Sequence, residues 1–229
     1  MPLGPAEPQQ VGLTESQQTA LARLHEVLRR GGLAVLCGAS GTGKTMLVRR
    51  LASECAHTPG WSVRGPCGVR SFLEQTAAGG VDLSAGERRV LAVIDDAHRV
   101  HDGADLARVV DALQMPPAHA VVVLVGEGRL LTLLSRQPDL EQRVVLRAPL
   151  TPWRVQETQQ LIGTRLPSFG ARPDAEPLCL RLHELAAGIP RQVVRLIDTV
   201  AMVLSAEPSH CVTLDDLETF HRRLSLQAA

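Results

Sequence analysis

The residues with the clearest capacity for chemistry lie together in the run "GASGTGKT", from Gly38 to Thr45. The spacing of its glycines, lysine and threonine is that of a phosphate-binding P-loop. Glycines let the backbone curl so that successive N–H groups face phosphate oxygens, and the helix that follows adds the positive end of its dipole. In such a loop Lys44 contacts the β- and γ-phosphates, and the Thr45 hydroxyl is a ligand of Mg²⁺. We therefore expect nucleotide to contact Gly38, Ala39, Ser40, Gly41, Thr42, Gly43, Lys44, Thr45 and Met46.

Lys44 is the only lysine of the chain, although lysine and arginine together number 24. An ammonium is a compact point charge on a flexible stem, whereas a guanidinium is a planar fork. A single lysine among so many arginines indicates a position into which the fork does not fit. The space between two phosphates of a nucleotide is such a position, so the composition supports the P-loop interpretation.

Two acids, Asp95 and Asp96, end a second apolar run, "LAVIDD". An acid at the tip of a strand beside a P-loop holds Mg²⁺, usually through water, and we assign that role to Asp95. Asp96 is then placed to orient and polarise the attacking water. His98, His101 and Asp102 follow closely, so a zinc site that includes Asp95 is an alternative interpretation. The P-loop already accounts for the two acids and favours the magnesium interpretation.

Short apolar runs and amphipathic stretches predict the elements that position these groups. Runs typical of buried parallel strands occur at 33–37, 89–98, 119–128 and 143–150. Helical periodicity occurs at 13–30, 45–56, 105–114 and 129–143, the last interrupted by Pro138. Thr14 can cap the first helix, with Gln17 as its capping-box partner. The stretch from 57 to 89 gives weaker signals, a strand at 61–66 and a helix at 69–78.

The sequence after Leu150 predicts helices alone, apart from a short extended stretch at 210–213. The helix that Asp174 caps is expected to run to about Ala187. The four expected helix starts are Thr151 with Pro152, Asp174, Pro190 and Thr213. We therefore expect a flexible leader at 1–12, an α/β nucleotide-binding core at 13–150 and a helical lid domain at 151–229.

The composition narrows the class of protein. Lysine plus arginine and aspartate plus glutamate both number 24, so the net charge gives no support for a strongly basic nucleic-acid-binding face. The cysteines are scattered and form no C-x-x-C, which is typical of a reducing compartment. No signal-peptide pattern opens the chain, and the longest apolar run, at 120–125, is too short to cross a membrane. These features predict a cytoplasmic protein without an integral membrane segment.

Five stretches resemble the AAA+ ATPases, in this order: "LAVLCGASGTGKT", "LAVIDDAH", "VVVLVGEGRLLTLLSR", "LEQRVVLRAPLTP" and "AAGIPRQVVRLID". Within these ATPases, the chain resembles the bacterial ExeA-type group associated with secretion and pili, and the TniB-like ATPases of transposition. The resemblance implies an α/β P-loop NTPase fold of the ASCE/AAA+ type, an αβα core with a parallel sheet followed by a small all-helical lid domain. It also implies ATP and Mg²⁺ as cofactors and a homo-oligomer. The chain lacks the peptidoglycan-binding and membrane segments of full-length secretion ATPases, so we expect a stand-alone motor module.

The resemblance further implies roles for two arginines and exposes two departures from the family pattern. Arg143, in "LEQR", matches the arginine finger that stabilises γ-phosphate charge in a neighbouring subunit. Arg191, in "GIPR", matches the sensor-2 arginine of the lid. Most relatives have Glu where Asp96 stands. A polar Asn, Ser or Thr is usual at the sensor-1 position, which here is Gly126-Glu127, so Glu127 is a candidate for that role.

The leading interpretation is an ATP-hydrolysing oligomeric switch that acts on a protein partner in a secretion, pilus or related assembly system. Membrane association through that partner stays open. The alternative is an ATP-dependent DNA-binding regulator of transposition, which arginine pairs such as Arg29/Arg30 permit and the neutral total charge weakens. A GTPase is disfavoured because the chain has no asparagine for a guanine-selecting loop. A small-molecule kinase is disfavoured by the acid pair and by the expected lid.

Overall fold

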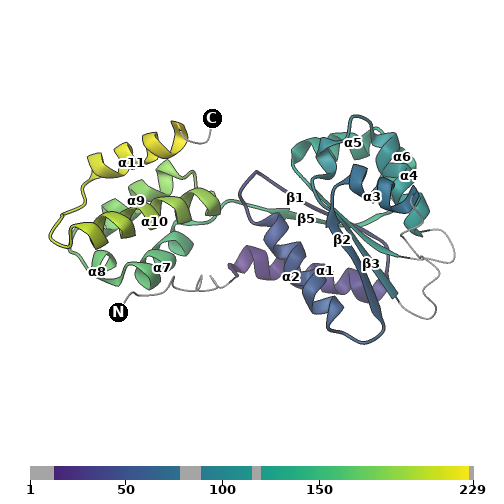
Figure 1. Ribbon diagram of the computed structural model, residues 1–229, viewed down its shortest axis with the longest axis horizontal. Helices are drawn as coiled ribbons and strands as arrows, with labels where there is room; N and C mark the ends of the chain where they lie inside the picture. Colours follow the sequence, from purple (N-terminus) through teal and green to yellow (C-terminus); the bar gives the residue numbers. More distant parts are fainter. Residues whose placement is uncertain (1–12, 78–88, 115–119, 227–229) are drawn as a thin grey trace. The chain divides into compact units, whose positions relative to one another are not determined.

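The computed structural model describes residues 13–77, 89–114 and 120–226, and the expected leader at 1–12 lies outside them. Contacts divide the described chain into two compact units: residues 16–151 form the first, and residues 13–15 and 152–226 form the second. The first unit holds a sheet with helices, and the second holds helices (Figure 1).

One parallel sheet organises the first unit. Its strand order is β2-β3-β4-β1-β5, and each neighbouring pair is parallel. The strands are β1 (Leu33–Gly38), β2 (Trp61–Cys67), β3 (Arg89–Ile94), β4 (Val121–Gly126) and β5 (Val144–Leu150). The predicted α/β class with a parallel sheet is therefore confirmed. Parallel strands bring their carboxyl ends to one edge, so the segments that follow β3, β4 and β1 are neighbours there.

Helices cover both faces of this sheet, which explains why its central strands are apolar throughout. Alternate strand residues such as Val35, Ala92 and Val122 share one core with buried residues of α3 to α6. Figure 1 shows α1 and α2 on the opposite side of the sheet. The helices are α1 (Glu15–Arg30), α2 (Lys44–Ala56), α3 (Val69–Ala77), the short 3-10 helix η1 (Ala97–Arg99), α4 (Gly103–Gln114), α5 (Gly128–Ser135) and α6 (Pro138–Gln142).

The expected element boundaries differ from the observed ones where acids or prolines end a run. The strand expected at 89–98 ends at Ile94, and the two acids begin a turn into η1. The helix expected at 129–143 is two helices, because Pro138 occupies the first turn of α6. The first correction places Asp95 and Asp96 after the end of β3 and not within the strand.

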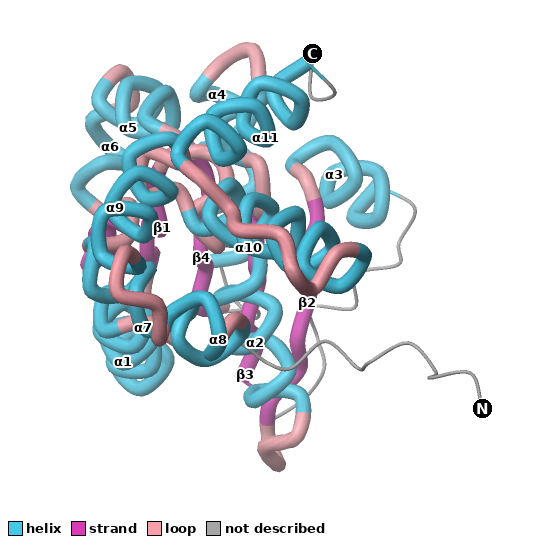
Figure 2. The backbone as a smooth tube through the Cα atoms, turned by 90° about the vertical axis from the view of Figure 1, so that its left-hand side faces the viewer, coloured by secondary structure: helices cyan, strands magenta, loops and turns pink. Residues whose placement is uncertain are grey.

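The second unit is a group of helices around its own apolar core (Figure 2). Trp153, Phe169, Leu182, Ile197 and Leu217 are buried there. The helices are α7 (Val155–Arg165), α8 (Pro167–Gly170), α9 (Ala175–Leu185), α10 (Pro190–Ala206) and α11 (Leu214–Leu226). No strand occurs at the predicted extended stretch 210–213, all of which the structure describes.

The first helix of this unit starts later than expected. The Trp153 N–H donates to Gly188 O at 2.7 Å, which holds the segment before α7 in an extended course. The Arg154 N–H then donates to Glu157 Oε2 at 2.7 Å, a contact that closes the first turn of α7. The prediction that Thr151 and Pro152 begin this helix is therefore wrong.

Within the residues described, none of the helices combines the length and the apolar character that crossing a bilayer requires.

Candidate phosphate-binding site

The run 38–45 forms a tight loop between the carboxyl end of β1 and the start of α2. Gly41 and Gly43 have φ values of 83° and 96°, a backbone region that favours glycine. A Cβ on Gly38 would lie 2.5 Å from Leu150 O of the neighbouring strand, so only glycine fits there. The helix α2 begins directly at Lys44, which places its positive end beside the loop. The loop can therefore present backbone N–H groups and a helix terminus to an anion.

Lys44 is buried beneath this loop, with 8% of its surface exposed. Its ammonium donates to Gly38 O at 2.8 Å and to Ala39 O at 2.9 Å. Burial lowers the pKa of Lys44, while the negative charges of Glu127 and Asp95 act in the opposite direction. Two carbonyls thus hold the lone lysine under the loop, and the acids at the same edge of the sheet oppose the fall of its pKa.

Thr45 and Asp95 meet at this edge. The Thr45 hydroxyl donates to Asp95 Oδ2 at 2.8 Å, and both side chains are partly exposed. Hydroxyl and carboxylate oxygens form a donor set that suits Mg²⁺, which binds proteins through few such ligands and keeps several waters. The two residues that the sequence assigns to magnesium are therefore in direct contact. An ion bound between them would replace this one hydrogen bond.

The structure does not support a zinc site formed by Asp95, His98, His101 and Asp102. Within the described residues, which include the whole stretch 89–114, no three His, Cys, Asp or Glu side chains gather as a metal site. His98 is turned inward instead: its Nδ1 is buried and lacks a hydrogen-bond partner. Its Cβ lies 3.2 Å from where a Cβ on Gly126 would be, so His98 lies beside the end of β4.

The Asp96 side chain has a different partner from that of Asp95. Its backbone has φ 51° and ψ 30°, and its N–H donates to Asp95 Oδ1 at 2.9 Å. Its carboxylate pairs with Arg99 Nε at 3.2 Å, and half of its side chain is exposed. The Asp96 side chain thus pairs with Arg99, and among the described residues no hydrogen bond joins its carboxylate to Lys44 or Thr45.

Arg143 lies in the same unit but at the other end of the sheet. In the register of β1 with β5, Leu33 pairs with Val144 and Gly38 pairs with Leu150. Arg143 precedes β5, so the length of that strand, about 20 Å at roughly 3.3 Å per residue, separates it from the loop. Its guanidinium pairs with Asp111, and its Nε donates to Gln114 Oε1 at 3.1 Å.

Arg191 belongs to the second unit, in the first turn of α10. Its side chain is exposed, and among the described residues no hydrogen bond or ion pair engages it. A cation is disfavoured in a first helical turn, because the helix dipole is positive there. An anion that approaches this turn would relieve that repulsion.

Gln17 is a site residue that the sequence did not reveal as one. It is 5% exposed, and its Nε2 donates to Thr42 O within the loop at 3.3 Å. The same nitrogen lies 2.8 Å from where a Cβ on Gly43 would be. A signal existed, because Gln17 shares the buried face of α1 with Ala20, Leu21 and Leu24 at helical spacing.

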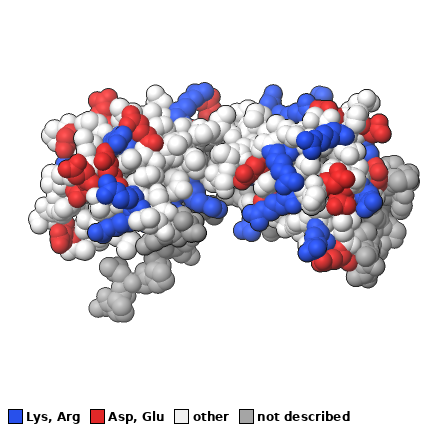
Figure 3. All heavy atoms as spheres, turned by 90° about the horizontal axis from the view of Figure 1, so that it is seen from above, with Lys and Arg blue, Asp and Glu red and all other residues white. Residues whose placement is uncertain are grey.

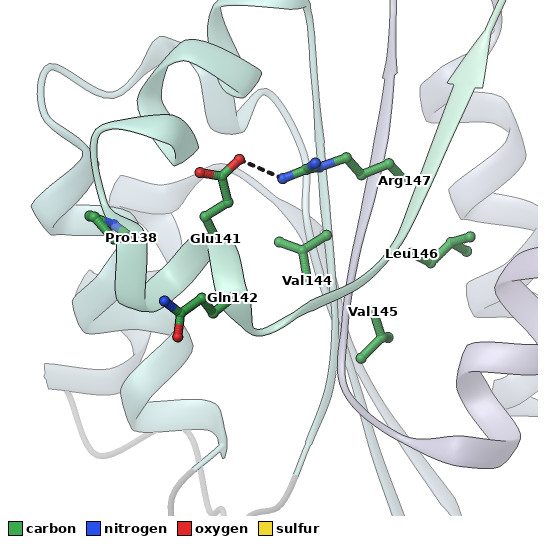
Figure 4. Close-up of a pocket in the computed structure, with 7 residues that line it drawn as sticks. All are labelled: Pro138, Glu141, Gln142, Val144, Val145, Leu146 and Arg147. Atoms are coloured by element: carbon green, nitrogen blue, oxygen red, sulfur yellow. Dashed lines mark hydrogen bonds and ion pairs between the residues drawn. The ribbon is translucent and has the colours of Figure 1, made fainter.

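An open hollow of about 410 Å³ lies between α6 and the edge strand β5, away from the loop (Figure 4). Valine and leucine side chains are among those that line it, and the charged residues in the described part of its lining are Glu141 and Arg147, which pair with each other at 2.7 Å. These groups satisfy each other, so the loop edge of the sheet is the stronger candidate for chemistry.

Comparison with known proteins bears on this arrangement. Residues 4–122 match the sequence model of a family described as AAA domain. None of the curated proteins compared with the chain matches it. The ADP form of the ORC2 protein of Aeropyrum pernix is similar over 95% of this chain and 70% of its own, with a TM-score of 0.59 and 15% identity. The RuvB Holliday junction branch migration motor of Thermotoga maritima is similar over 93% of this chain and 70% of its own, with a TM-score of 0.59 and 22% identity.

These structural similarities show the AAA+ fold, an α/β P-loop core with a helical C-terminal region, as the sequence predicts. The matched family segment covers more than half of the 229 residues. The chain therefore belongs to the AAA domain family.

Proposed function

We propose that this protein binds ATP with Mg²⁺ and hydrolyses it, as an AAA+ ATPase. The observation that carries the proposal is the buried Lys44 ammonium, held under a glycine loop beside the contact between Thr45 and Asp95. A buried cation, a row of backbone N–H groups and two magnesium-type ligands at one strand edge suit a polyphosphate.

Each residue of the loop edge has a task in this proposal. Lys44 leaves the carbonyls of Gly38 and Ala39 and donates to the phosphate oxygens, while the loop N–H groups and the start of α2 bind the rest of the polyphosphate. Thr45 and Asp95 hold the ion, Asp95 through water. When bound, Mg²⁺ neutralises charge that develops on the phosphate oxygens. In this proposal residues 13–150 act as the nucleotide-binding core.

We extend the proposal to a homo-oligomer. Arg143 stands one strand length from the loop of its own subunit, so it can serve only the nucleotide of another copy. Arg191 in the helical unit, 151–229, is our candidate for a lid contact with the nucleotide phosphates. Hydrolysis would then alter contacts within the oligomer and the grip on a partner.

A nucleotide-binding and turnover experiment tests this function. Lys44→Ala should weaken ATP binding by roughly 10- to 100-fold, because it removes charged hydrogen bonds to phosphate. Arg50→Ala, on the exposed side of the same helix, is the matched control and should bind as the wild type does. Wild-type turnover that depends on Mg²⁺ supports the proposal. Wild-type protein that binds no ATP at millimolar concentration refutes it.

We propose that the ATPase acts on a protein partner of a secretion, pilus or related assembly system. This part of the proposal rests on the sequence resemblance alone. The second candidate is an ATP-dependent DNA-binding regulator of transposition, and the similarity to RuvB, a Holliday junction branch migration motor, favours it. The face seen in Figure 3 carries basic and acidic side chains interspersed, not a single basic field. An ATP-dependent and salt-sensitive shift of duplex DNA would favour the second candidate over the first.

A further inference from the structure

The tip of β4 occupies a central place at the edge of the sheet. In the strand order β3-β4-β1, this tip lies between Asp95, which follows β3, and the loop, which follows β1. The register pairs Cys37 with Gly126, so Glu127 stands level with Gly38. The γ-phosphate of a nucleotide bound by Lys44, Thr45 and Asp95 would lie among these same three strand ends.

The Glu127 carboxylate has no hydrogen-bond or ion-pair partner among the described residues, so it can interact with a ligand at the tip of β4. Glu127 is the N-cap residue of α5, yet its side chain makes no capping hydrogen bond. Among the described residues no hydrogen bond or ion pair engages its carboxylate, and the side chain is partly buried. Of the acids near Lys44, Glu127 has the largest charge interaction with its ammonium, ahead of Asp95 and Asp96. This effect on the pKa of Lys44 agrees with the register, which sets Glu127 level with Gly38 and so beside the loop.

Asp96 is less suited to take a proton from water at the same place. Its carboxylate pairs with Arg99 on the exposed side of η1, at 3.2 Å, and its backbone lies in a left-handed turn. An aspartate is also one methylene shorter than a glutamate. The residue that the sequence predicts as the water-polarising group thus has its acid engaged elsewhere.

We infer that Glu127 is the general base of ATP hydrolysis in this protein and that Asp96 is not; the inference rests on the proposed function. The Glu127 carboxylate accepts one proton from water while the water oxygen forms a bond to the γ-phosphorus. The bond between that phosphorus and the oxygen bridging to the β-phosphate breaks, and its electron pair stays on ADP. ADP and phosphate leave, and Glu127 returns its proton to solvent.

A carboxylate beside the γ-phosphate has a second consequence, which does not depend on turnover. Its negative charge opposes ATP more than ADP, because ADP lacks the terminal phosphate. Glu127→Gln should therefore tighten ATP binding relative to ADP by about tenfold, and Asp96→Asn should leave the ratio of the two dissociation constants unchanged.

The test compares these two isosteric variants in full-length protein. Glu127→Gln should lower turnover by at least about 100-fold while it still binds ATP, and Asp96→Asn should lower it by less than about tenfold. Equal or larger loss in Asp96→Asn overturns the assignment, as does a Glu127→Gln variant that hydrolyses ATP at the wild-type rate. An unchanged ratio of ATP to ADP affinity in Glu127→Gln overturns it as well.

A rescue experiment separates a chemical role from a structural one. Glu127→Ala leaves space for a small external base, so formate should restore part of the lost turnover, and it should not accelerate Asp96→Ala. No rescue in Glu127→Ala counts against the general-base role. The affinity measurements separate two outcomes. A wild-type protein that does not bind ATP refutes both the proposed function and the role of Glu127. A wild-type protein that binds ATP, with variants that do not differ as expected, refutes only the role of Glu127.

Discussion

At the residue scale, the phosphate-binding loop depends on a contact from outside it. The Gln17 amide, in the first turn of α1, reaches Thr42 O across 25 positions of the chain. Thr42 itself is 1% exposed, so water cannot easily replace this donor. A buried carbonyl that loses its partner costs more than the hydrogen bond contributed. The position of α1 and the shape of the loop are thereby linked.

This link predicts the effect of Gln17→Leu. The variant removes a donor but keeps an apolar side chain of similar size, so it should lower the free energy of unfolding by about 1–3 kcal/mol. It should also weaken ATP binding, because the loop is no longer held from α1. Gln156→Leu makes the same change at an exposed position of α7 and should do neither. Urea denaturation and nucleotide titration measure both effects, and equal behaviour of the two variants would contradict the link.

Gly38 gives a second prediction at this scale. A Cβ there would lie 2.5 Å from Leu150 O, a backbone atom that cannot move without shifting β5. Gly38→Ala should therefore lower the free energy of unfolding by about 1–3 kcal/mol. Gly128→Ala is the matched control, because nothing lies within 4 Å of its added Cβ. Stability curves in urea measure the difference, and a loss shared by both variants would refute the steric argument.

At the element scale, hydrophobic periodicity predicted where strands and helices form. Runs buried on both faces became β1, β3 and β4, and amphipathic stretches became helices. What periodicity could not predict was the course of short polar connections. The Trp153 contact with Gly188 delays α7, and Asp96, in a left-handed turn, pairs with Arg99. The first depends on a residue 35 positions away along the chain, and the second depends on the conformation of a turn; hydrophobic periodicity reports neither.

The same limit applies to the candidate site. The contacts between Thr45 and Asp95 could be anticipated, because one motif fixes each residue and parallel strands bring their ends together. The place of Gln17 and the strength of the Glu127 charge at Lys44 could not, since both depend on how separate elements pack. The roles of Arg143 and Arg191 stay predictions.

The start of α11 provides a prediction about pH. The Asp216 carboxylate accepts from the Thr213 N–H at 2.9 Å and from its hydroxyl, and the Thr213 backbone contact is the largest cause of the lowered pKa of Asp216. A lowered pKa in the folded state means that this stabilisation is present above the ordinary Asp pKa of about 4 and is lost as pH falls through the folded value.

Asp216→Asn should therefore reduce stability by about 1 kcal/mol at neutral pH, in line with the loss of a helix cap. The difference from the wild type should shrink in the acid range, where the wild-type carboxyl is protonated and is therefore uncharged like the amide of the variant. Thr199→Ala, which removes a hydroxyl from the middle of α10, is a control whose effect should not vary over that range. Thermal unfolding as a function of pH measures the difference, and a difference that grows on acidification would reverse the sign and contradict the cap.

At the scale of the whole molecule, the proposed oligomer depends on what Arg143 does. Within one subunit its guanidinium is held by Asp111 and Gln114, and only about a third of the side chain is exposed. The hollow between α6 and β5 lies directly beside it, and the exposed Val145 of the edge strand lines that hollow (Figure 4). To reach the nucleotide of another copy, Arg143 must exchange Asp111 for a phosphate.

Arg143→Ala should bind ATP as the wild type does but lose turnover by roughly 10³-fold, the scale of an arginine finger. Wild-type turnover per subunit should rise with protein concentration, and Asp111→Asn, which frees the guanidinium, should shift that rise to lower concentration. Arg30→Ala, an exposed arginine of α1 paired with Glu26, is the control and should change nothing.

A mixture of two inactive variants tests whether the arginine acts between subunits. Arg143→Ala keeps an intact loop but lacks the finger, and Lys44→Ala lacks the loop lysine but keeps the finger. If Arg143 serves a neighbour, a Lys44→Ala subunit supplies the missing guanidinium to the nucleotide of an Arg143→Ala subunit, and the mixture should hydrolyse ATP although neither variant does so alone. If Arg143 only secures α4 through Asp111 and Gln114, each copy carries its own defect and mixing restores nothing. Turnover of the mixture across subunit ratios therefore decides between a finger that acts in trans and a structural arginine.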